Sequence, residues 1–460
     1  MEQDKTMKKM AETPVNKLML SMGIPMIVSM VLQAFYNIVD SAFVSNMKGN
    51  GEAAINALTL AFPVQMLMVA VSIGTGVGMN ALLSKSLGQG DKVRAAKIAG
   101  NAEFLGAVIY VVCLLFGIFG VGSYIRSQTQ NEEIYSMAVS YLRICCTLSF
   151  GIVCFSVFEK LLQATGLSLY STIAQISGAV INIVLDPVLI YGIGGAPQLG
   201  VRGAAYATVI GQTASCVIAL AFHLTKNKSV ANGLKYMRPE GRVIKGIYSI
   251  GFPAIIAQAL MSVMTYGLNL ILVRVDESMV TAYGLYYKIQ QFILFAAFGL
   301  RDAITPIVSF SHGMGSRERV SSGIKYGVKY TLIIMAVGLA ALELWAVPLT
   351  RVFRLSGMTE QLCISAVRII SICFIFAGFN IAAQGIFQAL DGGLHSLVIS
   401  VLRQFLLVLP VAYGFSLLAR RDMDNAWTVW LTFPIAEGIS AAIALLFMKI
   451  TKREKVDVLT

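Results

Sequence analysis

An asparagine and an aspartate stand four residues apart inside a long apolar segment of the chain. Asn182 and Asp186 therefore share one face of a predicted helix, and Pro187 follows directly. Because proline has no N–H, the carbonyl of Ile183 loses its helical hydrogen bond. Carboxylate, amide and carbonyl oxygens are the groups that a proton relay or a small cation uses. In the alternative interpretation, Pro187 only kinks the helix and Asp186 caps or bonds a neighbouring helix.

A second acid, Asp40, lies late in the first apolar segment. Gln33, Tyr36 and Asn37 precede it at helical spacing, so the four polar side chains share a face. A charge in the middle of a bilayer costs about 2.5–3.5 kcal/mol, and intramembrane acids therefore mark ion or substrate pathways. Asp40 could instead be close enough to the outer surface to be solvated. Thr208, in another apolar segment, adds a hydroxyl to this polar set.

Further polar and flexible side chains in the apolar segments are candidates for a substrate cavity. Lys288, Gln291 and Phe295 are three and four residues apart, so one helical face carries a charge, an amide and a ring. Asp302 could also belong to a salt bridge between helices. The predicted cavity set is Gln33, Tyr36, Asn37, Met66, Tyr266, Lys288, Gln291, Phe295 and Asp302.

The remaining reactive residues do not form a recognisable catalytic or metal site. The seven cysteines contain no Cys-x-x-Cys motif, and the three histidines stand near segment ends without partner residues. Glu437 and Arg403, in separate apolar segments, could pair with each other. We therefore predict neither an enzyme nor a bound cofactor.

The composition is that of a membrane protein. Hydrophobic residues make up 57% of the 460 residues and charged residues 13%, whereas a soluble protein carries about 25% charged residues. Apolar stretches of about 20 residues are long enough to cross a bilayer. They start near Lys17, Ala53, Ile98, Ser136, Tyr170, Gly203, Gly246, Met279, Tyr326, Glu360, Leu394 and Asn425. We predict an all-α membrane protein with twelve transmembrane helices.

The chain contains two copies of one pattern. Residues 21–25 (SMGIP) return at 249–253 as SIGFP, and residues 88–90 (GQG) return at 313–315 as GMG. Glycines, prolines and an arginine match in order along the rest of the two halves. Internal repeats of this size are typical of membrane transporters.

Six spans in each repeat would enter the membrane in the same direction. Two such lobes are related by a pseudo-two-fold axis along the membrane normal, and the space between them is the expected substrate cavity. The predicted lobes are residues 1–224 and 246–460, with a cytoplasmic linker at 225–245. Lysine and arginine are more frequent in the segments that this topology places inside, so both termini are expected in the cytoplasm. The +12 net charge is scattered over loops, which does not favour nucleic-acid binding.

The chain resembles the MATE (multidrug and toxic compound extrusion) family over essentially its whole length. It is most similar to the DinF- and MepA-type branch of that family. The resemblance rests on GIP at 23–25, NIVD at 37–40, GQGD at 88–91, QATG at 163–166 and the stretch 182–192. It implies two six-helix lobes, drug efflux, and coupling to protons or sodium ions.

The resemblance also implies a cation site in the amino-terminal lobe. Its oxygens come from an aspartate in span 1, an asparagine and an aspartate in span 5, and a threonine in span 6. Matching positions here are Asp40, Asn182, Asp186 and Thr208. Another group of the family couples through carboxylates in spans 7 and 10. The interior polar residues of those spans are here Gln258, Asn269, Asn380 and Gln384, which does not favour carboxylate coupling in the carboxy-terminal lobe.

We therefore predict a monomeric, multi-pass protein of the cytoplasmic membrane that exports amphipathic or cationic drugs or metabolites by alternating access. Its partners would be these small molecules and membrane lipids. Uptake of a proton or a sodium ion at the acids would bend the first span near Pro25, because the carbonyl of Ser21 has no helical donor there. The rival predictions are a flippase of lipid-linked saccharides in the same superfamily, which should carry more cationic cavity residues, and a membrane enzyme. The residues do not choose between proton and sodium.

Overall fold

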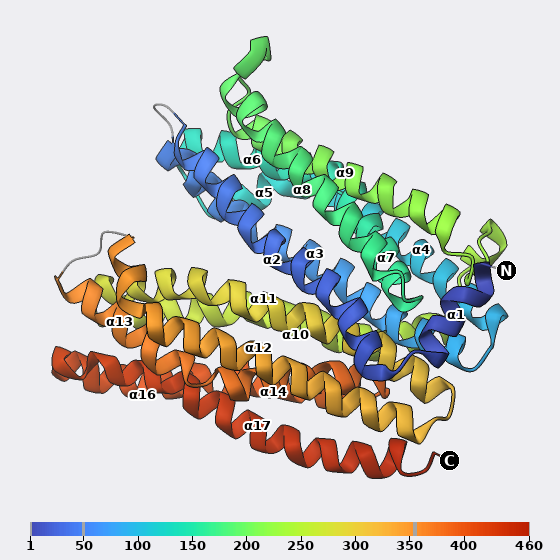
Figure 1. Cartoon of the computed structure of the whole chain (residues 1–460). Helices are drawn as coiled ribbons and strands as arrows, with labels where there is room; N and C mark the ends of the chain where they lie inside the picture. The colour runs from blue at the N-terminus through green and yellow to red at the C-terminus, as the bar shows by residue number, and fades with distance from the viewer. Residues whose placement is uncertain (1, 48–50, 353–356, 460) are drawn as a thin grey trace. The chain divides into compact units, whose positions relative to one another are not determined.

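The computed structural model describes residues 2–47, 51–352 and 357–459, and these are almost entirely helical (Figure 1). No strand occurs within these ranges. Among the described residues, ten helices are long and apolar enough to cross a membrane, and two pairs of bent helices would each add one more span. The prediction of an all-α protein with twelve membrane helices is confirmed.

The helices follow one another through short connections. The first half contains α1 (Glu2–Glu12), α2 (Val15–Ser45), α3 (Gly51–Gly88), α4 (Lys92–Leu115), η1 (Phe116–Gly120), α5 (Val121–Arg126), α6 (Glu132–Thr147), α7 (Phe150–Ala164), α8 (Ser168–Tyr191), η2 (Ile193–Gly195), α9 (Val201–Lys226) and η3 (Leu234–Met237). The second half contains α10 (Gly241–Leu272), α11 (Glu277–Gly313), α12 (Arg317–Val352), α13 (Gly357–Ser371), α14 (Phe374–Ala389), α15 (Gly393–Val401), η4 (Leu402–Leu406), α16 (Val408–Arg421), η5 (Met423–Leu431), α17 (Thr432–Thr451) and η6 (Lys452–Val456).

The sequence repeat has a structural counterpart in both halves. Ser84 of α3 donates a hydrogen bond to the carbonyl of Ala164 at the end of α7 (3.1 Å). Its repeat partner, Ser309 of α11, donates to the carbonyl of Ala389 at the end of α14 (3.0 Å). The fourth and tenth spans are also broken alike, since α6 meets α7 at 44° and α13 meets α14 at 51°. The matching residues therefore hold equivalent helix pairs together.

The chain packs as two compact units whose boundaries cut through two helices. The first unit contains Met1–Thr13 and Val28–Ile255, and the second contains Pro14–Ile27 and Ile256–Thr460. The amino-terminal part of α2 thus packs with the second unit, and the amino-terminal part of α10 packs with the first. The predicted lobes, with their linker at 225–245, are divided according to the sequence repeat. The two units are divided according to packing, so their boundaries fall inside α2 and α10.

The amino-terminal parts of α2 and α10, which we call the exchanged half-helices, each pack closely against a glycine of the unit that they join. In the first unit, a Cβ atom on Gly74 of α3 would lie 2.8 Å from the carbonyl oxygen of Gly251 in α10. In the second unit, a Cβ atom on Gly299 of α11 would lie 2.7 Å from the Cα atom of Ile27 in α2. Gly74 and Gly299 are equivalent in the repeat, so the same small-residue contact is used twice.

The prolines of the repeated segment lie beside the unit boundaries. Pro25 is inside α2 and Pro253 inside α10, each two residues before its helix passes from one unit to the other. Four residues before each proline, the hydroxyls of Ser21 and Ser249 donate hydrogen bonds to carbonyls one turn earlier (3.1 and 2.7 Å). The residue predicted as the hinge, Pro25, therefore lies where α2 changes its packing partners.

The segment predicted as the linker, residues 225–245, packs within the first unit. The side chain of Asn101 in α4 accepts a hydrogen bond from the backbone N–H of Glu240 (2.8 Å) and donates one to the carbonyl of Arg238 (3.3 Å). Lys97 forms an ion pair with Glu240 (2.9 Å). The short helix η3 lies within this segment. These contacts tie the start of α10 to α4.

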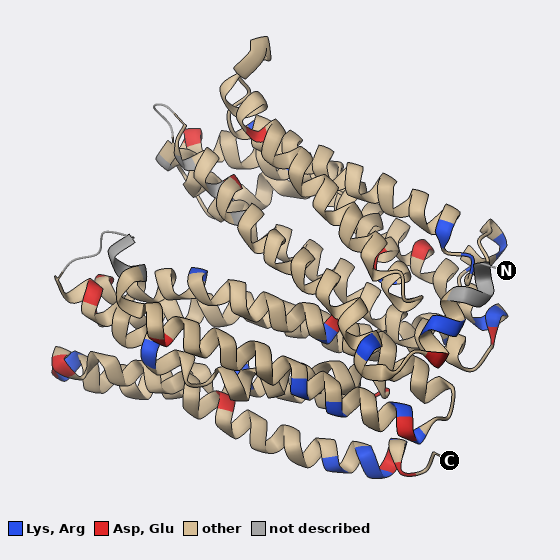
Figure 2. Cartoon of the chain, viewed as in Figure 1, with Lys and Arg blue, Asp and Glu red and all other residues tan. Residues whose placement is uncertain are grey.

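Each unit has its own apolar core, and the charged side chains lie mostly toward helix ends. In the first unit, Leu142 of α6 is buried with Ala57 and Ala61 of α3. In the second unit, the ring of Tyr283 stacks on Trp430 (6.3 Å between centroids) and Phe433 (5.8 Å). Figure 2 shows long central stretches of the helices without charged residues in both units. Charged residues that do lie within the spans therefore need a particular explanation.

Candidate ion-binding site

The carboxylate of Asp186 lies in the interior of the first unit, on α8. Asp186 and Asn182 are 0% and 1% exposed. The side-chain nitrogen of Asn182 donates a weak hydrogen bond to Asp186 Oδ1 (3.4 Å). Among the described residues, Asp186 Oδ2 and Asn182 Oδ1 have no hydrogen-bond partner. Two oxygens that are costly to bury therefore remain available for a proton or a cation.

Asp40 of α2 brings a second carboxyl group to this point. Its side chain is an electrostatic neighbour of Asp186. Asp40 Oδ1 is buried and has no hydrogen-bond partner in the described part of the chain. Two neighbouring carboxylates repel each other when both are ionised, so a shared proton or a bound cation lowers their energy.

Glycines allow α8 and α9 to approach closely enough to complete the site. A Cβ atom on Gly178 would lie 2.4 Å from the carbonyl oxygen of Gly211, and one on Gly211 would lie 2.9 Å from Asn182 Cβ. Thr208, one turn before Gly211, is 7% exposed. Its hydroxyl oxygen is buried without a hydrogen-bond partner among the described residues, and Thr208 lines the same cavity as Tyr36 of α2. Small residues at both positions thus set the distance between the two helices.

The residues predicted for ion coupling are therefore brought together by α2, α8 and α9. These are Asp40, Asn182, Asp186 and Thr208. Their free atoms are oxygens from carboxylates, an amide and a hydroxyl, which are the ligand types of hard cations. The donor set fits sodium, and the paired carboxylates fit a proton. The function of these residues remains a prediction.

A small cavity of about 80 Å³ within the first unit is lined by two of the predicted ion-coupling residues, Asn182 and Thr208, but not by the two acids. Gln33 and Tyr36 of α2, Asn182 of α8 and Thr208 of α9 contribute to its wall. Drug-sized ligands occupy pockets of about 300–1,000 Å³. This cavity is therefore of a size for an ion and water rather than for an organic substrate.

A polar network in this cavity was not predicted from the sequence. Gln175 of α8 donates a hydrogen bond to Gln33 Oε1 (2.6 Å), and the hydroxyl of Ser29 bonds to Gln175. Gln212 and Ser215 of α9 also line the wall. Their spacing would have identified them, because Gln175 lies seven residues before Asn182, and Gln212 lies four residues after Thr208.

The other residues predicted for the substrate cavity are divided between the two units. Met66 of α3 is half-buried in the first unit, and the side chain of Asn37 lies outside the described residues. In the second unit, Tyr266 of α10 is 68% exposed. Lys288 of α11 is exposed, and Gln291 and Phe295 of the same helix are half-buried. Their role in substrate binding remains a prediction.

Asp302 has a nearby basic partner. The side chain of Asp302 is buried in the second unit, and its Oδ1 atom accepts hydrogen bonds from Arg301 Nη2 (2.9 Å) and Nε (3.1 Å). The Arg301 guanidinium carbon also lies 5.0 Å from the centroid of the Phe298 ring. The predicted ion pair of Asp302 therefore includes its sequence neighbour Arg301 on α11, and a role of Asp302 between helices stays a prediction.

The second unit also contains a buried ion pair that the sequence analysis proposed. Arg403 of η4 donates to Glu437 Oε1 of α17 through Nη2 (2.5 Å) and Nε (2.9 Å). Asn380 of α14 donates to the other carboxylate oxygen (2.7 Å). Both Glu437 oxygens therefore have donors, and the carboxylate is neutralised where it stands.

Comparisons with known proteins agree with this architecture. A family model described as MatE matches residues 25–188 and 253–414. The multidrug export protein MepA of Staphylococcus saprophyticus is 23% identical over 437 residues, which is 95% of this chain and 94% of the relative. MepA of Staphylococcus haemolyticus is 23% identical over 438 residues, with 94% and 93% covered.

Solved structures give the same result. A crystal structure of a MATE protein in complex with MaL6 superposes with a TM-score of 0.89 at 25% identity, covering 96% of this chain and 97% of that one. An outward-facing multidrug resistance MATE family transporter of the MOP superfamily superposes with a TM-score of 0.88 at 24% identity, covering 97% and 98%. The similarity thus extends over nearly the whole of each chain.

Proposed function

The chain belongs to the MatE family, and we propose that it is an antiporter that exports amphipathic or cationic organic compounds in exchange for protons or sodium ions. Family membership makes it a multidrug efflux transporter and not an enzyme. The relatives named as multidrug export proteins do not favour the alternative of a saccharide flippase. The observation that carries the ion coupling is the pair of neighbouring, incompletely bonded carboxyl groups of Asp40 and Asp186.

The proposed coupling begins at these two acids. A proton taken up there would remove the repulsion between the carboxylates and allow one to donate to the other. A sodium ion would do the same with Asp40, Asn182, Asp186 and Thr208 as oxygen ligands. Either ion relieves the cost of burying charged groups within a membrane span.

The proposed transmission of this event runs along α2. Asp40 lies near one end of α2, and Pro25 lies in the part that packs with the other unit. A shift of Asp40 toward Asp186 would change the bend of α2 near Pro25, where one helical hydrogen bond is already missing. The bend would reduce the space for the drug. Ion and drug would then bind antagonistically, with a coupling free energy of about 1–3 kcal/mol.

The proposed setting is the cytoplasmic membrane, with both termini inside. The excess of lysine and arginine in the corresponding segments supports this orientation. We propose a monomer as the working unit. The drug would contact predicted cavity residues such as Gln33 and Tyr36 of the first unit.

Transport by purified protein in liposomes tests the proposal. A fluorescent organic cation is loaded, and its efflux is followed under an imposed pH gradient and then under an imposed sodium gradient. We expect efflux to exceed that of protein-free vesicles under at least one gradient, and the drug to drive counter-movement of that ion. Equal rates with and without both gradients would contradict ion coupling.

A further inference from the structure

A groove on the second unit combines a long apolar wall with basic side chains. It has a volume of about 670 Å³ and is lined by residues of α12, α14, α17 and η6. The apolar wall includes Val328 and Leu332 of α12, Phe379 of α14 and Met448 of α17. We call this surface the α12 groove. It is separate from the ion site, which lies in the first unit.

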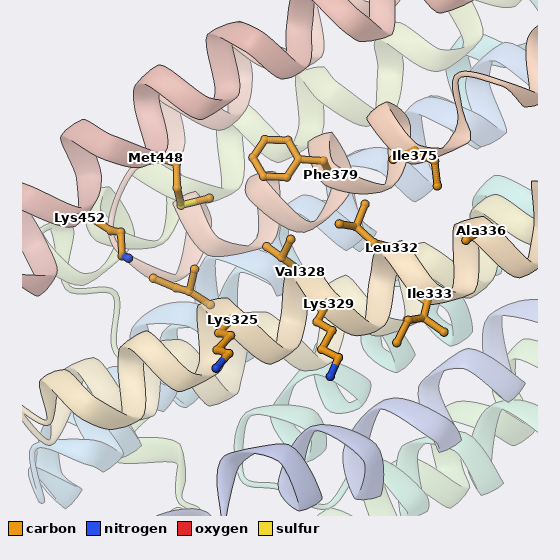
Figure 3. A pocket seen from close by; sticks show the side chains of 11 residues that line it. Lys325, Val328, Lys329, Leu332, Ile333, Ala336, Ile375, Phe379, Met448 and Lys452 are labelled. Atoms are coloured by element: carbon orange, nitrogen blue, oxygen red, sulfur yellow. The ribbon is translucent and has the colours of Figure 1, made fainter.

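Three lysines belong to the same lining. Lys325 and Lys329 stand one turn apart on α12, and Lys452 begins η6 directly after α17. Figure 3 shows Lys452 and Lys325 toward one end of the groove, and Ile375 and Ala336 toward the other. Lys329 lies between these two ends in the view, so the charged part of the groove runs from Lys452 to its middle and the uncharged part lies beyond.

The lysine charges are not neutralised by protein groups. All three lysines are exposed, and none forms an ion pair with a described residue. No aspartate or glutamate is among the lining residues. Nearby Arg317 differs, because it is paired with Asp457 (2.8 Å). The groove therefore has an uncompensated positive charge at one end and an apolar surface beyond it.

The length of α12 indicates the depth of these lysines. Its 36 residues correspond to about 54 Å, longer than the ~30 Å hydrocarbon core of a bilayer. The first turns of α12 thus extend past the core. Tyr326 and Tyr330 lie beside the lysines with ring centroids 5.8 Å apart. Tyrosines are typical of the membrane–water interface, which favours a position of Lys325 and Lys329 near the lipid headgroups.

We propose that the α12 groove binds one anionic phospholipid. Its phosphate would lie among Lys325, Lys329 and Lys452, and an acyl chain would follow the apolar wall from Val328 toward Ala336, a rise of about 12 Å. Basic pockets between membrane helices recognise acidic lipid headgroups in this way. The proposal uses the membrane setting given above, but it does not depend on ion coupling.

Native mass spectrometry of the full-length protein in detergent tests this site. The protein is titrated with dioleoyl phosphatidylglycerol or with dioleoyl phosphatidylcholine, which carry identical acyl chains. We expect one phosphatidylglycerol to be retained at concentrations where phosphatidylcholine is not. The triple variant K325Q/K329Q/K452Q should bind phosphatidylglycerol at least tenfold more weakly, since each lysine near a headgroup contributes about fivefold in affinity.

A matched variant separates the groove from general surface charge. K92Q/K226Q/K245Q removes the same charge from exposed lysines that are not in the groove, and it should bind phosphatidylglycerol like the wild type. Ala336→Trp keeps every lysine but fills the apolar end, and it should weaken retention of the two-chain lipid.

Three results would overturn the proposal. Equal retention of the two lipids would mean that the lysines do not select a headgroup. Equal loss in the two triple variants would mean that overall charge, not the groove, holds the lipid. Displacement of the lipid by millimolar glycerol phosphate would identify a site for a soluble phosphate. Because these measurements involve no transport, their failure is distinguishable from failure of the proposed efflux.

Discussion

Two buried carboxylate clusters, one in each unit, have opposite bonding. In the first unit, Asp40 and Asp186 are electrostatic neighbours and retain oxygens without donors among the described residues. In the second unit, Glu437 receives an arginine and an amide at its two oxygens. One cluster has a charge without a partner, and the other has a charge that is already neutralised.

This difference separates an exchangeable site from a permanent contact. A carboxylate that has a guanidinium partner gains little from a proton or a sodium ion, and losing the partner is costly. A pair of acids without such a partner gains directly from taking up either ion. The two halves share one repeat, but of these two described clusters only the one in the first unit keeps carboxylate oxygens without donors, as an exchangeable ion site would require.

The largest expected effect is at the acids of the first unit. We predict that Asp186→Asn and Asp40→Asn each reduce gradient-driven efflux to the level of protein-free vesicles, while the protein still inserts and folds. An amide has nearly the same shape but cannot exchange a proton or balance a cation. Transport in proteoliposomes and the thermal unfolding midpoint check the two parts of this prediction. Wild-type efflux by either variant would remove that residue from the coupling mechanism.

Mutation of the ion pair in the second unit should lower stability and leave ion-driven transport intact. Glu437→Ala leaves Arg403 buried without a counter-charge, and we predict a loss of about 3–5 kcal/mol in stability. The folded fraction should keep its response to the ion gradient. The double variant R403M/E437M removes both charges and should recover most of the stability. Loss of ion response in a well-folded double variant would show that the second unit also takes part in coupling.

The sequence alone predicts much of this contrast. Helical spacing places Asn182 with Asp186 on one face, and Arg403 and Glu437 are recognisable as rare charges in apolar segments. These patterns are local, or they follow from the cost of an unpaired charge in lipid. The twelve spans are equally visible, because apolar length is a property of each segment.

Contacts between segments that are distant in the chain could not be predicted from the sequence. The polar face that contains Gln175 is visible in the sequence, but nothing there shows that it meets Gln33 of α2. The approach of α8 to α9 depends on Gly178 and Gly211, two of 41 glycines. The sequence also does not predict that the exchanged half-helices pack with the opposite unit. A repeat identifies equivalent segments, but it does not identify the segments against which they pack.

A steric change behind the ion site tests the geometry without removing a ligand. Gly211→Ala places a methyl group within 2.6 Å of the carbonyl oxygen of Gly178. We predict a destabilisation of about 1–3 kcal/mol and a weaker sodium response in liposomes. Gly438→Ala in α17 is the matched control, because no atom lies within 4 Å of the added carbon. Equal effects of the two variants would mean that α8–α9 packing does not set the site.

The prolines inside α2 and α10 test whether the two units also differ in how much their helices bend during transport. Pro25→Ala restores a backbone donor toward the carbonyl of Ser21, so α2 should become stiffer. We predict severalfold slower transport with drug affinity unchanged, measured by turnover and by binding in detergent. Pro253→Ala should have a smaller effect, because no acidic pair acts on α10. An equal or larger defect at Pro253 would mean that both units share the conformational work.

The smallest expected effect is at Asp276, a carboxylate outside the membrane spans that already has hydrogen-bond donors. Asp276 is exposed and caps α11, where its Oδ1 atom accepts a hydrogen bond from the backbone N–H of Ser278 (2.8 Å). The hydrogen bond from the Ser278 hydroxyl, and secondly this backbone bond, lower the pKa of Asp276 below its ordinary value of 3.8. The charged form therefore stabilises the folded protein above about pH 4, and this contribution disappears as the pH falls through the lowered pKa.

We predict that Asp276→Ala lowers stability by about 0.5–1 kcal/mol at pH 7, and that the difference from the wild type shrinks at pH 3. Asp276→Asn keeps the acceptor oxygen and should lose less at pH 7. The thermal unfolding midpoint in detergent measures both variants, and transport should be unchanged because this carboxylate already has its donors. A transport defect in either variant would show that an acid with satisfied hydrogen bonds can still govern the exchange, and the distinction between the paired and unpaired carboxylates would lose its functional meaning.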